Sequence, residues 1–235
     1  MTEAPGLSKP ILPGSAGSDY ERYLRTDELL ALQKTEAEWI HRDELLFQTV
    51  HQSSELWLKL AWNEVEAAAG LVEADDLPAA LRLLRRANDC LKIVTGALDM
   101  LEHMSPWEYT TVRKVLGHGS GFDSPGFREI RRVTPLLGEA FDHARERAGL
   151  SLVEVYTRGR EFDALYNLAE QMIEWDERVT VWRVRHFKVV QRVIGADVVG
   201  TQGTPVEVMG RLIHRSFFPE LWDVRNELTR MNPPE

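Results

Sequence analysis

Residues 41–70 read HRDELLFQTVHQSSELWLKLAWNEVEAAAG, with no proline and with glycine only at the last position. Apolar side chains recur in this stretch every three or four residues, which places them on one face of an α-helix. Further apolar residues on the flanks of that face widen it beyond the stripe of an ordinary surface helix. The stretch therefore predicts one long helix, from about Asp43 to Gly70, that is buried on more than one side.

Helical spacing continues on both sides of this helix from Tyr20 onward, and no stretch shows the strict two-residue alternation of a half-buried strand. Asp76 and Pro78 predict the start of a second long helix, whose apolar residues run from Leu77 to Leu98. The sequence therefore predicts an all-α fold, a helical bundle built on long buried helices.

Two serines, each followed by a glutamate three residues later, match the capping-box pattern of a helix start. Ser105 with Glu108 predicts the start of a short helix before the glycine-rich loop at 117–126. Ser151 with Glu154 predicts the start of the longest periodic stretch, which ends at a glycine at position 195. Two shorter helices are expected near the C-terminus, with a proline between them at position 219.

The chain has 235 residues, a formal net charge of −9 and one cysteine. A length of this order fits one globular domain. Residues 1–18 contain three prolines and three glycines and offer too few apolar side chains to offset the entropy lost on ordering. We expect residues 1–18 to form a disordered tail and residues 19–235 to form a single all-α domain.

The negative charge balance and the lack of any Lys/Arg run argue against a nucleic-acid or anionic-membrane partner, since phosphates need clustered cations. Charged residues interrupt every apolar stretch well short of the ~18 residues that span a bilayer. The N-terminus lacks the basic and apolar regions of a signal peptide. Cys90 cannot form an intrachain disulfide, which is compatible with a reducing compartment. We expect a cytoplasmic protein with no nucleic-acid and no membrane partner.

Two histidines, His51 and His186, take the place of an apolar residue on the buried stripes of two different predicted helices. A buried imidazole needs a partner. One interpretation is a pair of core histidines that hydrogen-bond to neighbours; the other is that facing helices present one or both rings to a metal or a haem. A di-iron carboxylate site needs two Glu-x-x-His pairs on separate helices, and only Glu38 with His41 has this spacing.

Arg113 follows Tyr109 by four residues on the same helical face, just before the glycine-rich loop. Its planar guanidinium suits a ligand carboxylate, although a surface ion pair is an equal alternative. The loop at 200–204 is either a second contact for such a carboxylate or a plain turn. No nucleotide-binding or serine-hydrolase motif is present, and Cys90 is interpreted as a packing residue.

Several blocks of the chain, in order along it, resemble the tryptophan 2,3-dioxygenase family. The most specific is the long-helix signature that contains His-Gln-x-x-Glu-Leu-Trp at positions 51–57. The other blocks are Tyr20–Leu24, Arg113–Gly117, Ser120–Phe122, Trp182–His186, Arg192–Gly195, Gly200–Thr201 and Phe217–Leu221. The resemblance extends from Tyr20 nearly to the C-terminus.

The resemblance implies a fold in which long buried helices enclose a b-type haem. It implies that His186 is the axial ligand of the haem iron and so the metal-binding residue. It implies that His51 is the catalytic histidine, facing the nitrogen of the substrate's indole ring. It further implies that Ser120 and Trp57 belong to the cofactor site.

The substrate-binding residues implied by the resemblance come from several parts of the chain. Arg113 is implied to pair with the substrate carboxylate, with Tyr109 and Thr201 close to the amino-acid head group, while Phe47 packs on the indole. In this family an N-terminal segment enters the pocket of a neighbouring subunit. This implies a homotetramer in which three residues of one subunit help to close the site of another: Tyr20, Tyr23 and Leu24.

The implied activity is haem-dependent oxygenation of the indole ring of L-tryptophan or a close derivative, with ferrous haem b as cofactor and molecular oxygen as co-substrate. Dioxygenation with cleavage of the C2–C3 bond to N-formylkynurenine, a kynurenine-pathway reaction, is the first expectation. The chain between Ser124 and His186 is shorter than in typical members, and Asp123 stands where they usually carry Gln. These departures leave open a monooxygenase that forms a 2-oxindole or hydroxylated tryptophan derivative in secondary metabolism.

Two other classes of protein also stay open as alternatives to an oxygenase. A bis-histidine electron-transfer bundle predicts a six-coordinate haem with no response to substrate. A haem-free structural bundle predicts no haem absorption at all.

Overall fold

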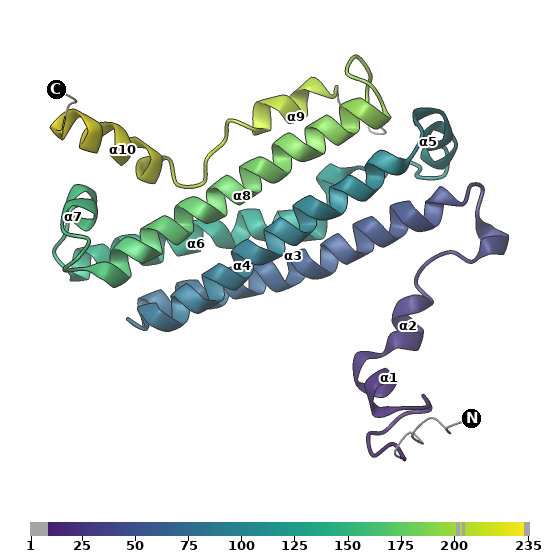
Figure 1. The fold of residues 1–235 in the computed structure, drawn as a ribbon, viewed down its shortest axis with the longest axis horizontal. Coiled ribbons are helices and arrows are strands. Elements are labelled where there is room, and N and C mark those ends of the chain that lie inside the picture. The colour runs from purple at the N-terminus through teal and green to yellow at the C-terminus, as the bar shows by residue number, and fades with distance from the viewer. Residues whose placement is uncertain (1–8, 201–202, 204, 233–235) are drawn as a thin grey trace, which may run out of the picture.

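The computed structural model describes residues 9–200, 203 and 205–232, and the predicted all-α fold is confirmed. No strand occurs among these residues; one isolated bridge joins Val199 to Pro205. Four long helices form an elongated bundle (Figure 1). They are α3 (Asp43–Glu73), α4 (Leu77–Ala97), α6 (Pro125–Arg147) and α8 (Asp163–Val193). Helix α3 packs against both α4 and α6, and α4 packs against α8.

Shorter helices lie at the ends of this bundle, along α8, or on the N-terminal segment that extends away from it. They are α1 (Asp19–Leu24), α2 (Thr26–Leu30), α5 (Pro106–Arg113), α7 (Leu152–Thr157), α9 (Glu207–Leu212) and α10 (Pro219–Met231), with 3₁₀ turns at Glu36–Glu38, Leu98–His103 and Gly121–Asp123. Helix α5 lies at one end of the bundle, and α9 runs beside α8 (Figure 1). Among the described residues, no helix combines the length and the apolar character that a bilayer crossing requires.

The two predicted long helices, α3 and α4, are confirmed close to their predicted bounds. Asp76 caps α4 by accepting a hydrogen bond from the backbone N–H of Ala79 at 3.1 Å, and Pro78 occupies the first turn. The turn between the helices passes through Asp75, which has a φ of 63°. This left-handed residue reverses the chain within three positions, so α3 and α4 pack as an antiparallel pair.

Helix α6 is not predicted by the periodicity of the sequence. It starts in the predicted loop, where the Ser124 side chain accepts a hydrogen bond from Phe127 N at 3.2 Å and Pro125 takes a first-turn position. It then continues through an internal proline, Pro135. Its inner face is fully buried against α3, which offsets the hydrogen bond that the proline removes.

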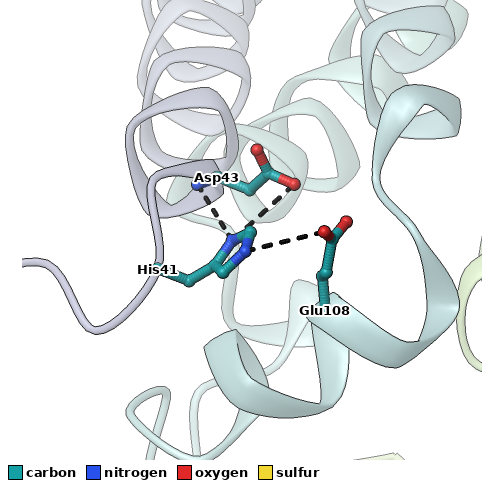
Figure 2. A group of neighbouring side chains, drawn as sticks. All are labelled: His41, Asp43 and Glu108. Atoms are coloured by element: carbon teal, nitrogen blue, oxygen red, sulfur yellow. Dashed lines mark hydrogen bonds and ion pairs between the residues drawn. The ribbon is translucent and has the colours of Figure 1, made fainter.

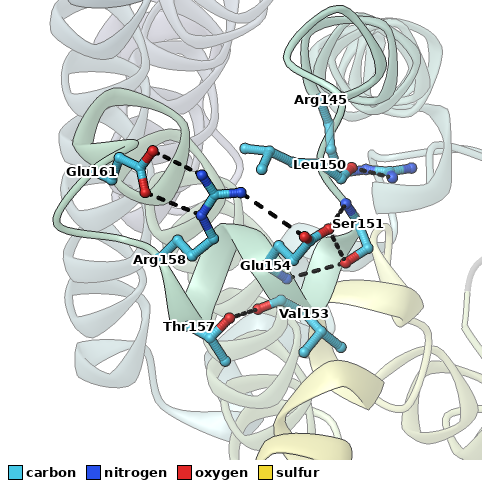
Figure 3. A network of polar contacts seen from close by, with 8 residues as sticks. All are labelled: Arg145, Leu150, Ser151, Val153, Glu154, Thr157, Arg158 and Glu161. Atoms are coloured by element: carbon cyan, nitrogen blue, oxygen red, sulfur yellow. Dashed lines mark hydrogen bonds and ion pairs between the residues drawn. The ribbon is translucent and has the colours of Figure 1, made fainter.

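The predicted capping box at Ser151 is present, but it begins a different helix from the one expected. Ser151 N donates to Glu154 Oε2 at 2.8 Å, and Glu154 N donates back to Ser151 Oγ at 3.2 Å (Figure 3). The helix that follows, α7, has only six residues. Arg158 then pairs with Glu161 at 2.7 Å while the chain turns, and the long helix α8 starts separately at Asp163. The prediction of one continuous helix from Ser151 was therefore wrong.

Two apolar clusters stabilise the bundle. The larger one fills the space between the long helices and includes Leu58, Leu84, Leu137 and Trp175, each at most 1% exposed. The smaller one joins α3, the 3₁₀ turn at Leu98–His103, α5 and the C-terminal part of α8, around Val50, Leu101, Tyr109, Val112 and Val189. A cavity lies beside this second cluster.

The N-terminal segment extends away from the bundle (Figure 1). Its backbone is held locally, since Ile11 N and Leu12 N donate to Asp19 at 3.0 and 2.7 Å. The predicted tail covers residues 1–18, of which 1–8 lie outside the described residues. The division into tail and domain stays a prediction.

Candidate active site

One cavity of about 560 Å³ opens between α3, α5, α6 and α8. The loop before α6 and the loop between α8 and α9 also contribute to its wall. Apolar side chains dominate its wall, and a small number of polar and charged groups interrupt them. This size and composition are typical of a site for a small organic ligand or cofactor. The cavity brings together His51, His186, Arg113 and Tyr109, which the sequence placed on three separate helices.

His51 lies on α3 and lines the cavity. Its Nδ1 lies 2.7 Å from the carbonyl oxygen of Phe47, one helical turn earlier, and the two rings are 4.0 Å apart between centroids. Because a carbonyl only accepts, Nδ1 carries the hydrogen and Nε2 is left with a free lone pair. Burial lowers the pKa of His51, so the ring is neutral at neutral pH. The Nε2 atom is therefore a hydrogen-bond acceptor available to a ligand.

His186 lies on α8 and lines the same cavity. Its ring stacks on Trp182 with centroids 4.8 Å apart and an interplanar angle of 8°. Burial, together with the nearby His51, lowers the pKa of His186 to about 4. The structure records no hydrogen bond from this imidazole to any described residue. A neutral imidazole with free ring nitrogens in an apolar cavity is suited to binding a metal.

The wall around His186 fits a planar haem. Trp182 is itself packed against Phe127, at 3.8 Å between ring centroids, so the ring that supports His186 is held in place. Gly121 faces His186 closely enough that an added Cβ would lie 3.8 Å from the imidazole Cε1. The Nε1 atom of Trp182 is buried without a partner among the described residues. We conclude that the residues present match an axial histidine with a mostly apolar pocket around it.

Arg113 and Tyr109 line the cavity from α5. Arg113 Nη2 donates to the carbonyl oxygen of Val199 at 2.6 Å, which connects α5 to the loop after α8. Tyr109 is only 9% exposed, and burial raises the pKa of its hydroxyl. Its ring lies 6.2 Å from that of Phe47, so the two aromatic side chains and Arg113 form one side of the pocket.

The loop before α6 forms another part of the wall. Ser120 accepts a hydrogen bond from Phe122 N at 3.3 Å, while its own N–H donates to Asp123 Oδ2 at 3.1 Å. Glu55, one turn after His51, holds this loop to α3: its carboxylate accepts from Ser124 Oγ at 2.5 Å and from Gly126 N at 2.9 Å. The Glu55 anchor thus positions the segment that faces His186.

Some predicted site residues are not part of this cavity within one chain. Trp57 is 39% exposed on α3 and does not line it. Tyr20, Tyr23 and Leu24 lie on α1, away from the bundle, with exposures of 68%, 78% and 45%. Thr201 lies outside the described residues.

Sequence reasoning missed three arginines on the cavity wall: Arg131, Arg183 and Arg215. A signal for one of them was available, because Arg183 precedes His186 by three residues and so shares its helical face. Arg131 lies on α6, which periodicity did not reveal, and Arg215 lies between α9 and α10.

Glu38 and His41, which have the Glu-x-x-His spacing, do not come together as a metal-binding pair in the structure. Glu38 instead accepts hydrogen bonds from its own cap, Thr35 N and Oγ1, both at 2.8 Å. His41 lies between Asp43 and Glu108, at 3.8 Å from each carboxylate (Figure 2). Asp43 N donates to His41 Nδ1 at 3.2 Å, so in the neutral ring Nε2 carries the hydrogen and faces Glu108.

This arrangement also explains an incomplete cap on α5. Ser105 accepts from Glu108 N at 3.5 Å as predicted, but the Glu108 carboxylate is directed at His41 (Figure 2). The capping box predicted at Ser105 is therefore only half formed. Glu108 instead joins the start of α3 to the start of α5.

Comparison with known proteins places this geometry in context. Residues 11–147 match the family model described as tryptophan 2,3-dioxygenase. The tryptophan 2,3-dioxygenase of a Bacillus cereus strain is 32% identical over 260 aligned positions, which cover 89% of this chain and 92% of that protein. The tryptophan 2,3-dioxygenase of Myxococcus xanthus is 31% identical over 280 positions, covering 97% and 96%. That of Caulobacter vibrioides is 30% identical, covering 89% and 98%.

Both His51 and Arg113 fall within the part matched by the family model, whereas His186 lies beyond it. The alignment with the Myxococcus protein covers 97% of the chain. These alignments are longer than the 235-residue chain itself, so they contain positions with no counterpart here. This agrees with a chain that is shorter than its relatives in some internal segment.

Proposed function

Because this chain belongs to the tryptophan 2,3-dioxygenase family, we propose that it opens the indole ring of L-tryptophan with molecular oxygen to give N-formylkynurenine. The family consists of haem-dependent oxidoreductases. The observation that carries the proposal is that His51 and His186 line one apolar cavity together with Arg113. One histidine has free ring nitrogens suited to iron, and the other has a free acceptor suited to an indole N–H.

His186 is assigned as the axial ligand of a b-type haem. Its neutral ring retains the lone pair that an iron ligand needs, because burial keeps its pKa near 4. Bound ferrous haem supplies the redox chemistry by which molecular oxygen reacts with an organic substrate. Trp182 stacks on the imidazole and fixes its plane, and Ser120 lies in the loop that faces His186 and lines the same cavity.

His51 is assigned to orient the indole. Its Nδ1–H donates to Phe47 O, which leaves Nε2 to accept the indole N–H. Phe47, whose ring lies 4.0 Å from that of His51, is assigned to pack on the indole. The indole is thereby held in one orientation, so that its C2–C3 bond is presented for reaction.

Arg113 is assigned to bind the substrate carboxylate. One of its N–H groups holds Val199 O, and the planar guanidinium retains further donors for a bidentate contact. Tyr109 lies one turn earlier on the same helix and closes the pocket next to Phe47. Thr201, which follows Val199 by two residues in the sequence and lies outside the described residues, is assigned to the amino-acid head group by the family resemblance. Binding energy from this non-reacting end of the substrate positions the ring.

The exposed α1 segment is assigned to a neighbouring subunit. Tyr20 and Tyr23 present two aromatic rings to solvent, which is unfavourable for an isolated chain. We propose that they cover the pocket of a second copy in a homotetramer, together with Leu24.

The reaction is tested by incubating L-tryptophan with haem-loaded, reduced protein under ¹⁸O₂ and measuring the mass of the product. Ring-opening dioxygenation requires both labelled atoms in N-formylkynurenine. His186→Ala protein, prepared in the same way, is the control for reactions of unbound haem.

A product with a single labelled atom would contradict this proposal and favour the monooxygenase. Two observations keep that alternative in view. Asp123 lines the cavity, and the relatives contain positions that this chain lacks. Absence of any haem absorption after haem supply would contradict both oxygenases.

A further inference from the structure

Three arginines from separate parts of the chain line the cavity: Arg131 on α6, Arg183 on α8 and Arg215 after α9. Burial lowers the pKa of Arg183, and Arg215 and Arg131 lie close enough to lower it further. Arg183 is half-buried, whereas Arg131 and Arg215 are exposed at the cavity. Like charges gathered in one place repel one another, so an anion that binds among them is favoured. The protein as a whole carries a net charge of −9, so this local excess of positive charge is not a general property of its surface.

The three guanidinium groups have no ion pair with any carboxylate among the described residues. The neighbour of one of them shows the usual arrangement: Arg132 pairs with Glu66 at 2.9 Å and with Glu129 at 2.6 Å on the outside of α6. Asp176 lies near enough to Arg183 to favour its charge but forms no ion pair with it. Asp176 Oδ2 accepts from Phe217 N, Phe218 N and Trp222 Nε1, and its buried Oδ1 has no hydrogen-bond partner among the described residues. Protein groups therefore compensate this cluster only in part.

Arg183 is held rigidly in this position. Its Nη1 donates to the carbonyl oxygens of Leu212 and Arg215, at 3.1 and 2.5 Å, and its guanidinium lies 5.3 Å from the ring centre of Phe217. These contacts connect α8 to the C-terminal end of α9. A desolvated cation fixed in advance loses little further entropy when it binds an anion.

The place of the cluster relative to His186 indicates what kind of anion fits. Arg183 precedes His186 by one helical turn, about 5 Å along α8, and lies on the same face. The wall between them is apolar and aromatic, with Trp182 and Phe127 in contact. A ligand that satisfies both features has a flat apolar body centred near His186 and carboxylates on one edge.

We propose that Arg131, Arg183 and Arg215 form the anchor for the two propionate carboxylates of the haem. This inference rests on the proposed function, since it requires the haem to be bound at His186. It separates two anion sites in one cavity. The arginine cluster takes the carboxylates of the cofactor, whereas Arg113 on α5, which holds Val199, takes the carboxylate of the substrate.

The test compares binding of haemin with binding of haemin dimethyl ester, in which both carboxylates are neutral. Apo-protein is titrated with each, and the Soret absorption and the rate of haem transfer to excess apomyoglobin are measured. The variants are Arg131→Gln, Arg215→Gln and the double variant, because neither side chain holds another element in place as Arg183 does. Arg211→Gln is the matched control: it lies on α9, is exposed and does not line the cavity.

In the wild-type protein we expect haemin to be retained more tightly than its ester. Each single variant should release haemin about tenfold faster, which is the effect of losing one charge-assisted hydrogen bond. The double variant should release haemin and ester at similar rates, and Arg211→Gln should behave as wild type.

Equal retention of haemin and its ester by the wild-type protein, with a normal Soret band, would overturn the anchor and leave the haem assignment intact. An unchanged rate of haemin release from the double variant would likewise overturn the anchor and leave the haem assignment intact. If neither compound produced a Soret band, the haem assignment itself would fail, and the anchor with it.

Discussion

His51 and His186 lie in one cavity but differ in the partners of their ring nitrogens. His51 gives its Nδ1 hydrogen to Phe47 O, whereas His186 has only a stacking partner, Trp182. An iron ligand needs a ring nitrogen with an accessible lone pair. A histidine that accepts a hydrogen bond from a substrate at one ring nitrogen is held in orientation when its other ring nitrogen donates to the protein. The two histidines therefore have separate assignments, although the sequence alone presents them as equivalent.

Replacing each histidine tests this difference. His186→Ala should abolish the Soret absorption of protein supplied with haem, because the axial ligand is lost. His51→Ala should retain the Soret band and lose about tenfold or more in kcat/KM for L-tryptophan, because one substrate hydrogen bond is removed. Equal loss of haem in both variants would indicate bis-histidine ligation and contradict the oxygenase assignment.

The acceptor role of His51 Nε2 is tested with a substrate that lacks the indole N–H. For the wild-type protein, 1-methyl-L-tryptophan should bind about tenfold more weakly than L-tryptophan, because Nε2 is left unpaired. For His51→Ala the two ligands should bind with similar affinity. Binding is measured by the change in the Soret band on titration. A preference for L-tryptophan that persists in His51→Ala would show that another group recognises the N–H.

The pKa of His186 predicts a pH-dependent stability of the haem-free protein. The imidazole of the unfolded chain has its ordinary pKa of 6.5, whereas burial lowers the pKa of the folded His186 to about 4, so between these pH values the unfolded state binds more protons. The free energy of unfolding should therefore fall as the pH is lowered from 6.5 to 4, by up to about 1.4 kcal/mol per pH unit from this group. Urea unfolding at several pH values measures it. In His186→Leu the free energy of unfolding should depend less steeply on pH. An identical dependence would contradict the conclusion that burial lowers the pKa of His186.

The candidate site was predictable from the sequence where residues lie on long amphipathic helices. His51 and His186 stand out because each replaces an apolar residue on a buried stripe, and both line the cavity. Arg215 and Asp123 gave no such signal, because loops have no periodicity that relates them to the core. The assignment of roles came from the family resemblance, since spacing alone left both a core histidine and a ligand open.

At the scale of elements, the close approach of α6 to α3 determines how the cavity wall is held. Gly126, in the first turn of α6, lies against Leu58 and donates its N–H to Glu55 at 2.9 Å. An added Cβ at Gly126 would lie 2.5 Å from Leu58 Cβ, which no side-chain rotation relieves. The loop that faces His186 therefore depends on a glycine at this position.

Gly126→Ala should lower the free energy of unfolding by about 1–3 kcal/mol, the usual cost of overpacking a core contact. It should also weaken haem retention, because the loop before α6 shifts. Gly70→Ala is the control: this helical glycine has no atom within 4 Å of an added Cβ, so alanine should stabilise the protein by about 0.5–1 kcal/mol. Thermal unfolding of both variants measures the difference. A neutral Gly126→Ala would show that α6 and α3 separate without cost.

The elements themselves were predictable to different extents. The bounds of α3 and α4 follow from an uninterrupted periodic run and from the Asp76 and Pro78 start signal. The start of α8 could not be predicted in this way, because the Ser151 capping box begins α7 and the chain then turns before Asp163. A capping box identifies where a helix begins but carries no information about its length. Helix α6 was missed because Pro135 interrupts its pattern, while tertiary packing against α3 maintains the helix.

At the scale of the whole molecule, the segment of α1 and α2 extends away from the bundle and is tied to α3 just after α2, where Leu32 O and Gln33 hydrogen-bond to Gln52. Tyr20 and Tyr23 are 68% and 78% exposed, and Leu30 and Leu32 add further exposed apolar surface at 73% and 66%. Several exposed large apolar side chains on one short segment favour a surface that contacts a partner. The segment lies away from the bundle (Figure 1), and no described residue of α1 or α2 lines the cavity. Exchange of the segment between copies satisfies both features at once.

Deletion of residues 1–32 tests this exchange. The full-length haem-loaded protein should elute as a homo-oligomer in size-exclusion chromatography with light scattering, and the deletion should reduce the mass per particle. The deleted protein should retain the Soret band, because His186 and the arginine cluster lie within the bundle. Its KM for L-tryptophan should rise about tenfold or more, since a neighbour no longer closes the pocket.

Tyr20→Ala with Tyr23→Ala separates assembly from closure. If the two rings cover a neighbour's pocket, this variant should raise KM even where the oligomer persists through the rest of the segment. Mixing it with His51→Ala protein then offers a decisive comparison. Exchange of subunits should restore part of the activity, because intact α1 segments from the His51→Ala chains reach pockets that still contain His51. A mixture no more active than the sum of its separate components would show that each chain completes its own site.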